Sequence, residues 1–255
     1  MYASMALATN EPFMTDKSYL STKKIPVRER LIFALDVPSE DEAKRYVQLL
    51  GASVCFYKLG LELFMAGRYF ELVDWLVAKN KKVFVDLKFF DVPETVRSAV
   101  RQLKNRGASF ATVHGNNDML KAAAEERNGL KILAVTVLTS LDRSDLEDLG
   151  FKCDVEALVL SRARRALELG CDGVISSGLE AAKLREGLGD RFLIVSPGIR
   201  PVENRQEDDQ KRVVTPTQAF LNGADYIVVG RPIRDAEDPC AAAERIQADI
   251  ATLFA

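Results

Sequence analysis

From residue 31 onward, short apolar runs rich in Val, Ile and Phe alternate with longer amphipathic stretches. This alternation is typical of repeated β-α-β units, in which a buried parallel strand is followed by a helix. Eight apolar runs fit the pattern: residues 31–35, 54–57, 83–85, 110–113, 132–137, 173–175, 192–195 and 226–229. Eight such units predict an α/β fold, a (β/α)8 TIM barrel forming a single domain over residues 25–255. The alternative is an open, doubly wound sheet.

The helix boundaries carry local signals that agree with this pattern. Ser39 followed three residues later by Glu42 is a capping box, and it predicts a helix over residues 40–50. The stretch 154–169 is amphipathic and predicts another helix. Further helix starts and stops are expected at Pro93, Gly170, Thr215 and Gly223.

Polar residues and glycines follow the predicted strands where each one ends. In a barrel of parallel strands these positions meet at one rim, which is where such folds carry their sites. The long connections 139–152 and 200–212 also follow strands, so we expect them on the same face. The rim residues are Asp36, Lys58, Asp86, Lys88, Thr139, Pro197, Gly198, Gly230 and Arg231.

The most informative rim segment is the third, where Asp86, Lys88 and Asp91 interrupt an apolar strand. Strand alternation predicts that Asp86 and Lys88 point to the same side, as a reaction centre would require. Each charge also has a plain structural interpretation. The pair could be a surface salt bridge at a corner, Asp36 a turn residue, and Lys58 an exposed lysine.

Composition limits the classes of function. With 47% hydrophobic and 28% charged residues among 255, the chain is an ordinary globular protein, and nothing in it calls for a membrane. A net charge of −2 argues against nucleic acid and allows a single small phosphate. The four cysteines form no Cys-x-x-Cys pair, and His114 is the only histidine, so no metal site is expected. Reduced core cysteines indicate a cytoplasmic protein, and residues 1–24 are expected to form a flexible extension.

The pattern Asp-x-Lys-x-x-Asp at 86–91 resembles the signature of the orotidine 5′-monophosphate decarboxylase superfamily. The segments Ser-Pro-Gly-Ile-Arg-Pro at 196–201 and Gly-Ala-Asp-Tyr-Ile-Val-Val-Gly-Arg-Pro at 223–232 resemble its bacterial members. The similarity spans about residues 31–239. The resemblance implies a carboxy-lyase that converts orotidine 5′-monophosphate to uridine 5′-monophosphate and CO2, the last step of de novo pyrimidine biosynthesis, without a metal or other cofactor.

The resemblance also implies roles for individual residues. Lys58, Asp86, Lys88 and Asp91 would form an alternating charged network, with Lys88 as the proton donor. The family arrangement is a homodimer in which Asp91 crosses a two-fold interface. Substrate contacts are implied for residues on several loops, with Gly230, Arg231 and Gln210 at the phosphate: Asp36, Lys58, Asp86, Thr95, Thr139, Arg200, Gln210, Gly230 and Arg231.

Two positions depart from the family pattern, which usually has His at Phe90 and often Asn at Glu94. Neither supplies a charge of the network. A magnesium-dependent sugar-phosphate decarboxylase or aldolase is the nearest alternative, but such enzymes place Glu where Lys58 stands, because Mg²⁺ needs oxygen ligands. A non-catalytic sensor of phosphorylated ligands is a third possibility, although it would have no use for Lys88.

Overall fold

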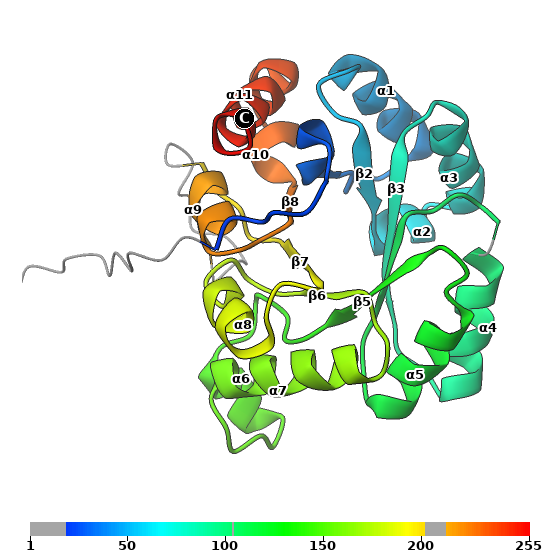
Figure 1. Ribbon diagram of the computed structural model, residues 1–255. Coiled ribbons are helices and arrows are strands. Elements are labelled where there is room, and N and C mark those ends of the chain that lie inside the picture. The colour runs from blue at the N-terminus through cyan, green and yellow to red at the C-terminus, as the bar shows by residue number, and fades with distance from the viewer. Residues whose placement is uncertain (1–18, 104, 202–212) are drawn as a thin grey trace, which may run out of the picture.

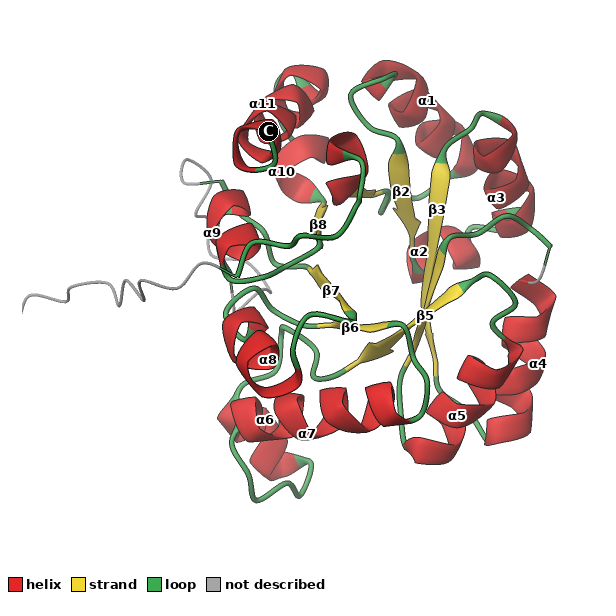
Figure 2. Cartoon of the chain, in the orientation of Figure 1, coloured by secondary structure: helices red, strands yellow, loops and turns green. Residues whose placement is uncertain are grey.

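The computed structural model describes residues 19–103, 105–201 and 213–255. Within them, eight parallel strands close into a barrel in chain order, with β8 pairing back to β1 (Figure 2). The strands are β1 Leu31–Ala34, β2 Phe56–Leu59, β3 Lys82–Phe89, β4 Phe110–Val113, β5 Lys131–Val135, β6 Gly173–Ile175, β7 Leu193–Ser196 and β8 Tyr226–Val229. The predicted barrel is therefore confirmed, and the open-sheet alternative is excluded.

The helices surround the strands on the outside (Figure 1). One helix or a pair of helices follows each strand, and a 3-10 turn, η1 Val27–Arg30, precedes β1. The helices are α1 Glu40–Leu50, α2 Leu61–Met65, α3 Tyr69–Ala78, α4 Pro93–Leu103, α5 Asn117–Glu126, α6 Arg143–Asp148, α7 Val155–Glu168, α8 Ala181–Leu188, α9 Pro216–Leu221, α10 Arg231–Arg234 and α11 Pro239–Leu253. No helix in these described ranges has the length and apolar character needed to cross a bilayer.

The helix starts predicted at Ser39 and Thr215 are confirmed. The Ser39 hydroxyl accepts a hydrogen bond from the backbone N–H of Glu42 at 3.2 Å, so α1 begins where the sequence indicated. The Thr215 hydroxyl caps α9 in the same way, and Pro216 occupies the first position of that helix. These signals were readable because each involves residues only two or three positions apart.

Several strand boundaries differ from prediction by one or two residues, and two strands run at least two residues past their predicted ends. The second strand, expected at 54–57, is β2 at Phe56–Leu59, and the third, expected at 83–85, extends to Phe89. An apolar run was used to place both strands, and such a run ends at the first charge. Lys58 and Asp86 lie inside the strands, so the predicted strands stopped too early.

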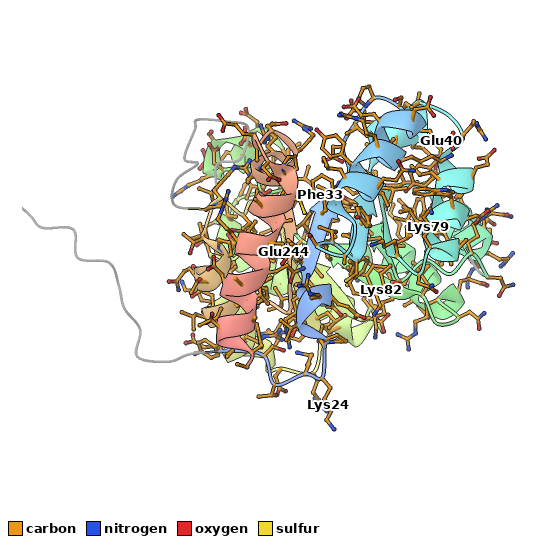
Figure 3. The ribbon with its side chains drawn as sticks, turned by 90° about the horizontal axis from the view of Figure 1, so that it is seen from above. Lys24, Phe33, Glu40, Lys79, Lys82 and Glu244 are labelled. Atoms are coloured by element: carbon orange, nitrogen blue, oxygen red, sulfur yellow. The ribbon has the colours of Figure 1, made fainter. Side chains whose placement is uncertain are left out.

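The apolar core has two layers. Side chains inside the barrel form one cluster, which includes Ile32, Phe56, Phe84 and Tyr226. The alternate positions of the same strands point outward and pack against the helices. Phe33 of β1, labelled in Figure 3, is one of these residues. Its ring centroid lies 6.0 Å from that of Tyr46 on α1.

Residues 19–24, expected to belong to a flexible extension, instead lie against the barrel. The backbone N–H of Tyr19 donates to the carbonyl of Leu221 at 2.8 Å. The Ser21 hydroxyl donates to Asp225 at 2.5 Å, and the Lys23 ammonium lies 3.1 Å from the same carboxylate. The expected boundary at residue 24 is therefore too late. Residues 1–18 lie outside the described part of the chain.

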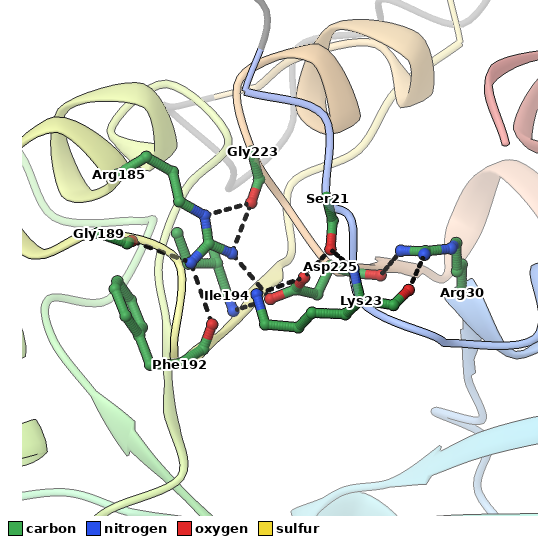
Figure 4. Close-up of polar contacts among 9 residues, drawn as sticks. All are labelled: Ser21, Lys23, Arg30, Arg185, Gly189, Phe192, Ile194, Gly223 and Asp225. Carbon is green, nitrogen blue, oxygen red and sulfur yellow. Dashed lines mark hydrogen bonds and ion pairs between the residues drawn. The ribbon is translucent and has the colours of Figure 1, made fainter.

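Asp225 is the centre of a buried charged cluster at the amino-terminal end of the barrel (Figure 4). It immediately precedes β8 and is fully buried. Its second carboxylate oxygen accepts from Arg185 at 2.8 Å and from the backbone N–H of Ile194 at 2.9 Å. Arg30, directly before β1, donates to the backbone carbonyl of Asp225 at 3.2 Å. The cluster thus joins β1, β7 and β8 where the barrel closes.

Asp225→Asn removes the negative charge of this cluster, so the Arg185 and Lys23 cations lose the carboxylate with which they pair. Removing one partner of a buried ion pair typically costs about 3–5 kcal/mol, and we expect the free energy of unfolding to fall by about that amount. Urea denaturation measures the change. As a control, Asp74→Asn loses only an exposed pair with Arg106 and should cost less than about 1 kcal/mol. Equal effects of the two substitutions would contradict this account.

Candidate active site

A cavity of about 500 Å³ opens at the carboxyl ends of the strands. Residues in the last part of β2 and β3 line it together with residues that follow β1, β5, β7 and β8, at the rim that the sequence predicted. Of the predicted site residues, the cavity contains Asp36, Lys58, Asp86, Lys88, Thr139, Arg200, Gly230 and Arg231. The chain therefore brings charges and glycines from distant positions to one concave site.

Aromatic rings form the floor beneath this cavity. The ring centroids of Phe56 and Phe110 are 5.0 Å apart, and those of Phe110 and Tyr226 are 5.1 Å apart. Phe84 packs edge-on against Phe110 at 5.9 Å. Three of these rings are followed two residues later by a polar side chain on the same strand. Phe56 precedes Lys58, Phe84 precedes Asp86, and Phe110 precedes Thr112. Because side chains alternate along a strand, each polar group points inward, one layer above the rings.

Lys58, Asp86 and Lys88 form a continuous charged array above that floor. The Asp86 carboxylate lies between two ammonium groups, with Oδ1 2.9 Å from Lys88 Nζ and Oδ2 3.4 Å from Lys58 Nζ. Lys58 also donates to Asp36 Oδ1 at 3.0 Å. Only 11% of the Asp86 and Lys58 side chains is exposed, against 34% for Lys88. Lys88 is thus the cation of the array that is most open to a ligand.

Burial and pairing act in opposite directions on these groups. Burial alone disfavours the charged forms of Lys58 and Asp86, but their attraction outweighs it. The pKa of Lys58 is consequently raised above its usual 10.5 by Asp86 and Asp36. The pKa of Asp86 is lowered below its usual 3.8 by Lys58 and Lys88.

These pKa shifts fix the pH range over which the array stabilises the fold. The folded-state pKa of Asp86 lies below the unfolded value, so its contribution is complete above pH 3.8 and is lost as the pH falls further. The folded-state pKa of Lys58 lies above the unfolded value, so the contribution of Lys58 to stability is complete below pH 10.5 and is lost as the pH rises further. Both charges are therefore maintained throughout the neutral range.

Regular strand alternation does not explain how Lys88 meets Asp86. The pairing of β3 with β4 shifts between Val85 and Phe89, and Lys88 has a positive φ of 47°. Few residues other than glycine adopt this conformation, and where it occurs it often marks a functional site. Here the backbone N–H of Lys88 is held by the Thr112 hydroxyl at 2.9 Å, which in turn donates to Asp86 at 2.9 Å. The predicted proximity is correct, but a strand irregularity produces it.

Two predicted site residues within the described ranges do not line the cavity. Asp91 is exposed, and its Oδ1 accepts from the backbone N–H of Val92 at 2.7 Å. Thr95 is exposed on α4 and does not line the cavity either. Gln210, expected at the phosphate, lies outside the described residues.

The two positions that depart from the family pattern flank Asp91. Phe90 is exposed and packs edge-on against His114, with ring centroids 5.6 Å apart. Burial, followed by the nearby charges of Arg162 and Lys88, lowers the pKa of His114. Glu94 pairs with Arg97 at 3.2 Å on the surface of α4. Neither departure touches the array.

Two residues that hydrogen-bond to Asp86 or Asp36 were missed by the sequence analysis. Thr112 is fully buried and is hydrogen-bonded to the array, and its only signal was a hydroxyl in the middle of an apolar strand. Arg234 lines the cavity from the end of α10. Its sequence position, three residues past Arg231, gave no sign that it turns back to the rim.

The match to known proteins agrees with this site. The model of the orotidine 5′-phosphate decarboxylase / HUMPS family matches residues 29–246, which include the whole barrel and every group of the array. This chain belongs to that family.

Individual members of the orotidine 5′-phosphate decarboxylase / HUMPS family are close in sequence and in structure. The chain is 67% identical over 238 residues to an orotidine 5′-phosphate decarboxylase of Methylococcus capsulatus, covering 93% of this chain and 98% of the relative. It is 53% identical over 228 residues to one of Xanthomonas axonopodis pv. citri, covering 89% and 93%. The crystal structure of the Lactobacillus acidophilus orotidine 5′-phosphate decarboxylase superposes with a TM-score of 0.77 at 37% identity, covering 87% of this chain and 99% of that one.

The opposing effects on Asp86 can be separated by substitution. Lys58→Met removes one of its two cationic neighbours while burial remains, so the pKa of the Asp86 carboxyl should rise. A carboxyl ¹³C NMR titration of aspartate-labelled protein, with the signal assigned through Asp86→Asn, measures this shift. The exposed Lys24→Met serves as a control and should leave the titration unchanged. If Asp86 titrated identically in Lys58→Met, Lys58 would not be what maintains its charge.

Proposed function

We propose that this chain is an orotidine 5′-phosphate decarboxylase that converts orotidine 5′-monophosphate to uridine 5′-monophosphate and CO2. This is the last step of de novo pyrimidine synthesis. The observation that carries the proposal is the Lys58–Asp86–Lys88 array above an aromatic floor, in a chain so similar to relatives of that name. The free thiols of all four cysteines fit the reducing cytoplasm in which we place the reaction.

The proposed chemistry uses charges that are already in place. Loss of CO2 from C6 of the pyrimidine leaves an electron pair on that carbon. The Lys88 ammonium stabilises this developing carbanion and then transfers its proton to C6, so that a C–H bond replaces the C–C bond. Asp86 faces the substrate carboxylate and disfavours it relative to the transition state. Lys88 regains its proton from water, and the cycle needs no cofactor.

Substrate binding is assigned to the rest of the rim. Asp36 contacts the ribose and Thr139 the pyrimidine. Arg231 holds the phosphate through its guanidinium, and the adjacent Gly230 lets the backbone approach. A Cβ on Gly230 would lie only 3.3 Å from that of Ala34, so a larger residue there would narrow the rim. Arg200 and Gln210 are proposed as further contacts from the long loop after β7.

The nearest alternative within the same family model is a magnesium-dependent sugar-phosphate enzyme. A hard cation requires several oxygen ligands at the reaction centre. In the parts of the chain that are described, no three His, Cys, Asp or Glu side chains are grouped to hold a metal ion. An ammonium, Lys58 Nζ, instead stands 3.0 Å from Asp36 and 3.4 Å from Asp86. It would repel a divalent ion there, which favours the nucleotide decarboxylase.

The direct test is the loss of orotidine 5′-monophosphate absorbance with the pure protein in excess chelator. We expect full turnover under these conditions. Lys88→Ala should lower kcat by at least about 100-fold, since a general acid typically contributes that much or more. It should still bind the product, because its ammonium acts mainly on charge formed in the transition state. Loss of activity in chelator that Mg²⁺ restores, or a kcat within about tenfold of wild type for Lys88→Ala, would contradict the mechanism.

We also propose that the active form is a homodimer in which Asp91 completes the partner's site. Asp91 stands between two exposed apolar residues, Phe90 at 66% and Val92 at 62%. On α2, which follows the neighbouring strand β2, Leu61 and Met65 are likewise exposed, at 57% and 79%. Apolar side chains concentrated beside a cavity are typical of a surface that another chain covers. A two-fold arrangement would direct each Asp91 to the other subunit.

Mixing two inactive variants tests the shared site. A dimer of Lys88→Ala and Asp91→Ala subunits has one pocket lacking both groups and one intact pocket. Random exchange makes about half of the dimers mixed, so about a quarter of the pockets should recover. The control mixture of Lys88→Ala with Asp86→Asn should recover none, because both of these residues serve their own pocket. If the first mixture stayed inactive despite demonstrated exchange, Asp91 would not cross the interface.

A further inference from the structure

Arg234 reaches from the end of the short helix α10 back to the rim of the cavity. Its Nη1 donates to the backbone carbonyl of Asp36 at 2.9 Å. The other edge of the guanidinium pairs with Asp235, with Nε 2.6 Å from Oδ1 and Nη2 3.1 Å from Oδ2. This two-point contact fixes the plane of the guanidinium and directs Nη1 at Asp36.

The backbone of Arg234 is held as firmly as its side chain. The hydroxyl of Tyr46, on α1, donates to the carbonyl of Arg234 at 3.0 Å. At the other end of α10, Gly230 packs closely against Ala34 of β1. The helix that begins with Arg231 is therefore tied at both ends to the segment that carries Asp36.

Asp36 is partly open to solvent at the rim. Its side chain is 41% exposed, and it nevertheless holds Lys58 at 3.0 Å. The space around this pair is narrow, because a Cβ on Gly60 would lie 3.1 Å from Asp36 Oδ1 and 3.2 Å from Lys58 Nζ. A small displacement of Asp36 would therefore move the Lys58 ammonium, and with it one side of Asp86.

We infer that Arg234, clamped by Asp235, is a positioning residue that fixes Asp36 and through it Lys58. The inference rests on the proposed decarboxylase function, and it assigns Arg234 a task different from phosphate binding. A guanidinium at the rim could in principle grip the phosphate as Arg231 is proposed to do. In Arg234, however, Nε, Nη1 and Nη2 all donate to groups of the protein itself. Its effect should therefore fall on the chemical step and not on the affinity for phosphate.

The test compares kcat with product affinity in variants of Arg234. Arg234→Met keeps an unbranched stem and removes every donor, and we expect kcat to fall about 10- to 100-fold, as small displacements of catalytic groups do. The dissociation constant of uridine 5′-monophosphate, measured by calorimetry, should stay within about twofold. Arg234→Lys retains one donor for the Asp36 carbonyl and should recover most of kcat. Asp235→Asn leaves the guanidinium but loosens its clamp, so it should lower kcat by less than Arg234→Met does.

Arg165→Met is the matched control, because Arg165 is an exposed arginine of α7 whose partner, Glu168, lies 2.8 Å away on the same helix. It should leave both kcat and product affinity unchanged. Weakened product binding in Arg234→Met, in proportion to its loss of kcat/KM, would make Arg234 a phosphate ligand and overturn the inference. So would an unchanged kcat in a folded Arg234→Met protein, or a failure of Arg234→Lys to recover activity. Failure of the wild-type protein to release CO2 would instead refute the proposed function.

Discussion

The site depends on keeping one carboxylate ionised in a nearly dry position. Taking Asp86 out of water is costly, and the cost is offset only because an ammonium stands on each side of it. That requirement fixes much of the surrounding architecture. β2 and β3 must be neighbours, the inward positions above the aromatic floor must be polar, and β3 must depart from regular geometry so that Lys88 can turn back. Thr112 meets the last need by holding the Lys88 backbone and the Asp86 carboxylate with one hydroxyl.

The same arrangement explains why the array is suited to chemistry and is not merely structural. Charges held above packed rings and shielded from water act on a ligand more strongly than the same charges at the surface. They also need no rearrangement when charge develops in the ligand, because the folded chain has already oriented them. Lys88, the more exposed of the two lysines, is the proposed proton donor.

The sequence predicted the barrel and most of the rim because both rest on local patterns. Apolar periodicity placed the strands, and residues two or three positions apart placed the helix starts. Charges in an apolar strand marked Lys58 and Asp86 as unusual, although the same charges made β2 and β3 look shorter than they are. The shift in β3 pairing was not readable, because it depends on how β4 aligns beside it. Arg234 and the Asp225 cluster were missed for a related reason, since their partners lie up to about two hundred residues away in the chain.

The two charged centres of the molecule occupy opposite ends of the barrel. The Asp225 cluster closes the amino-terminal end, whereas Asp86 and its lysines face the carboxyl-terminal cavity. The packed interior separates them, so we expect substitutions at one end to leave the hydrogen bonds of the other intact. Because of this separation, the cavity and the barrel closure can change independently during evolution. New specificities can arise in the loops that line the cavity while the closure of the barrel stays under independent selection, which makes the scaffold a practical starting point for redesigning substrate preference.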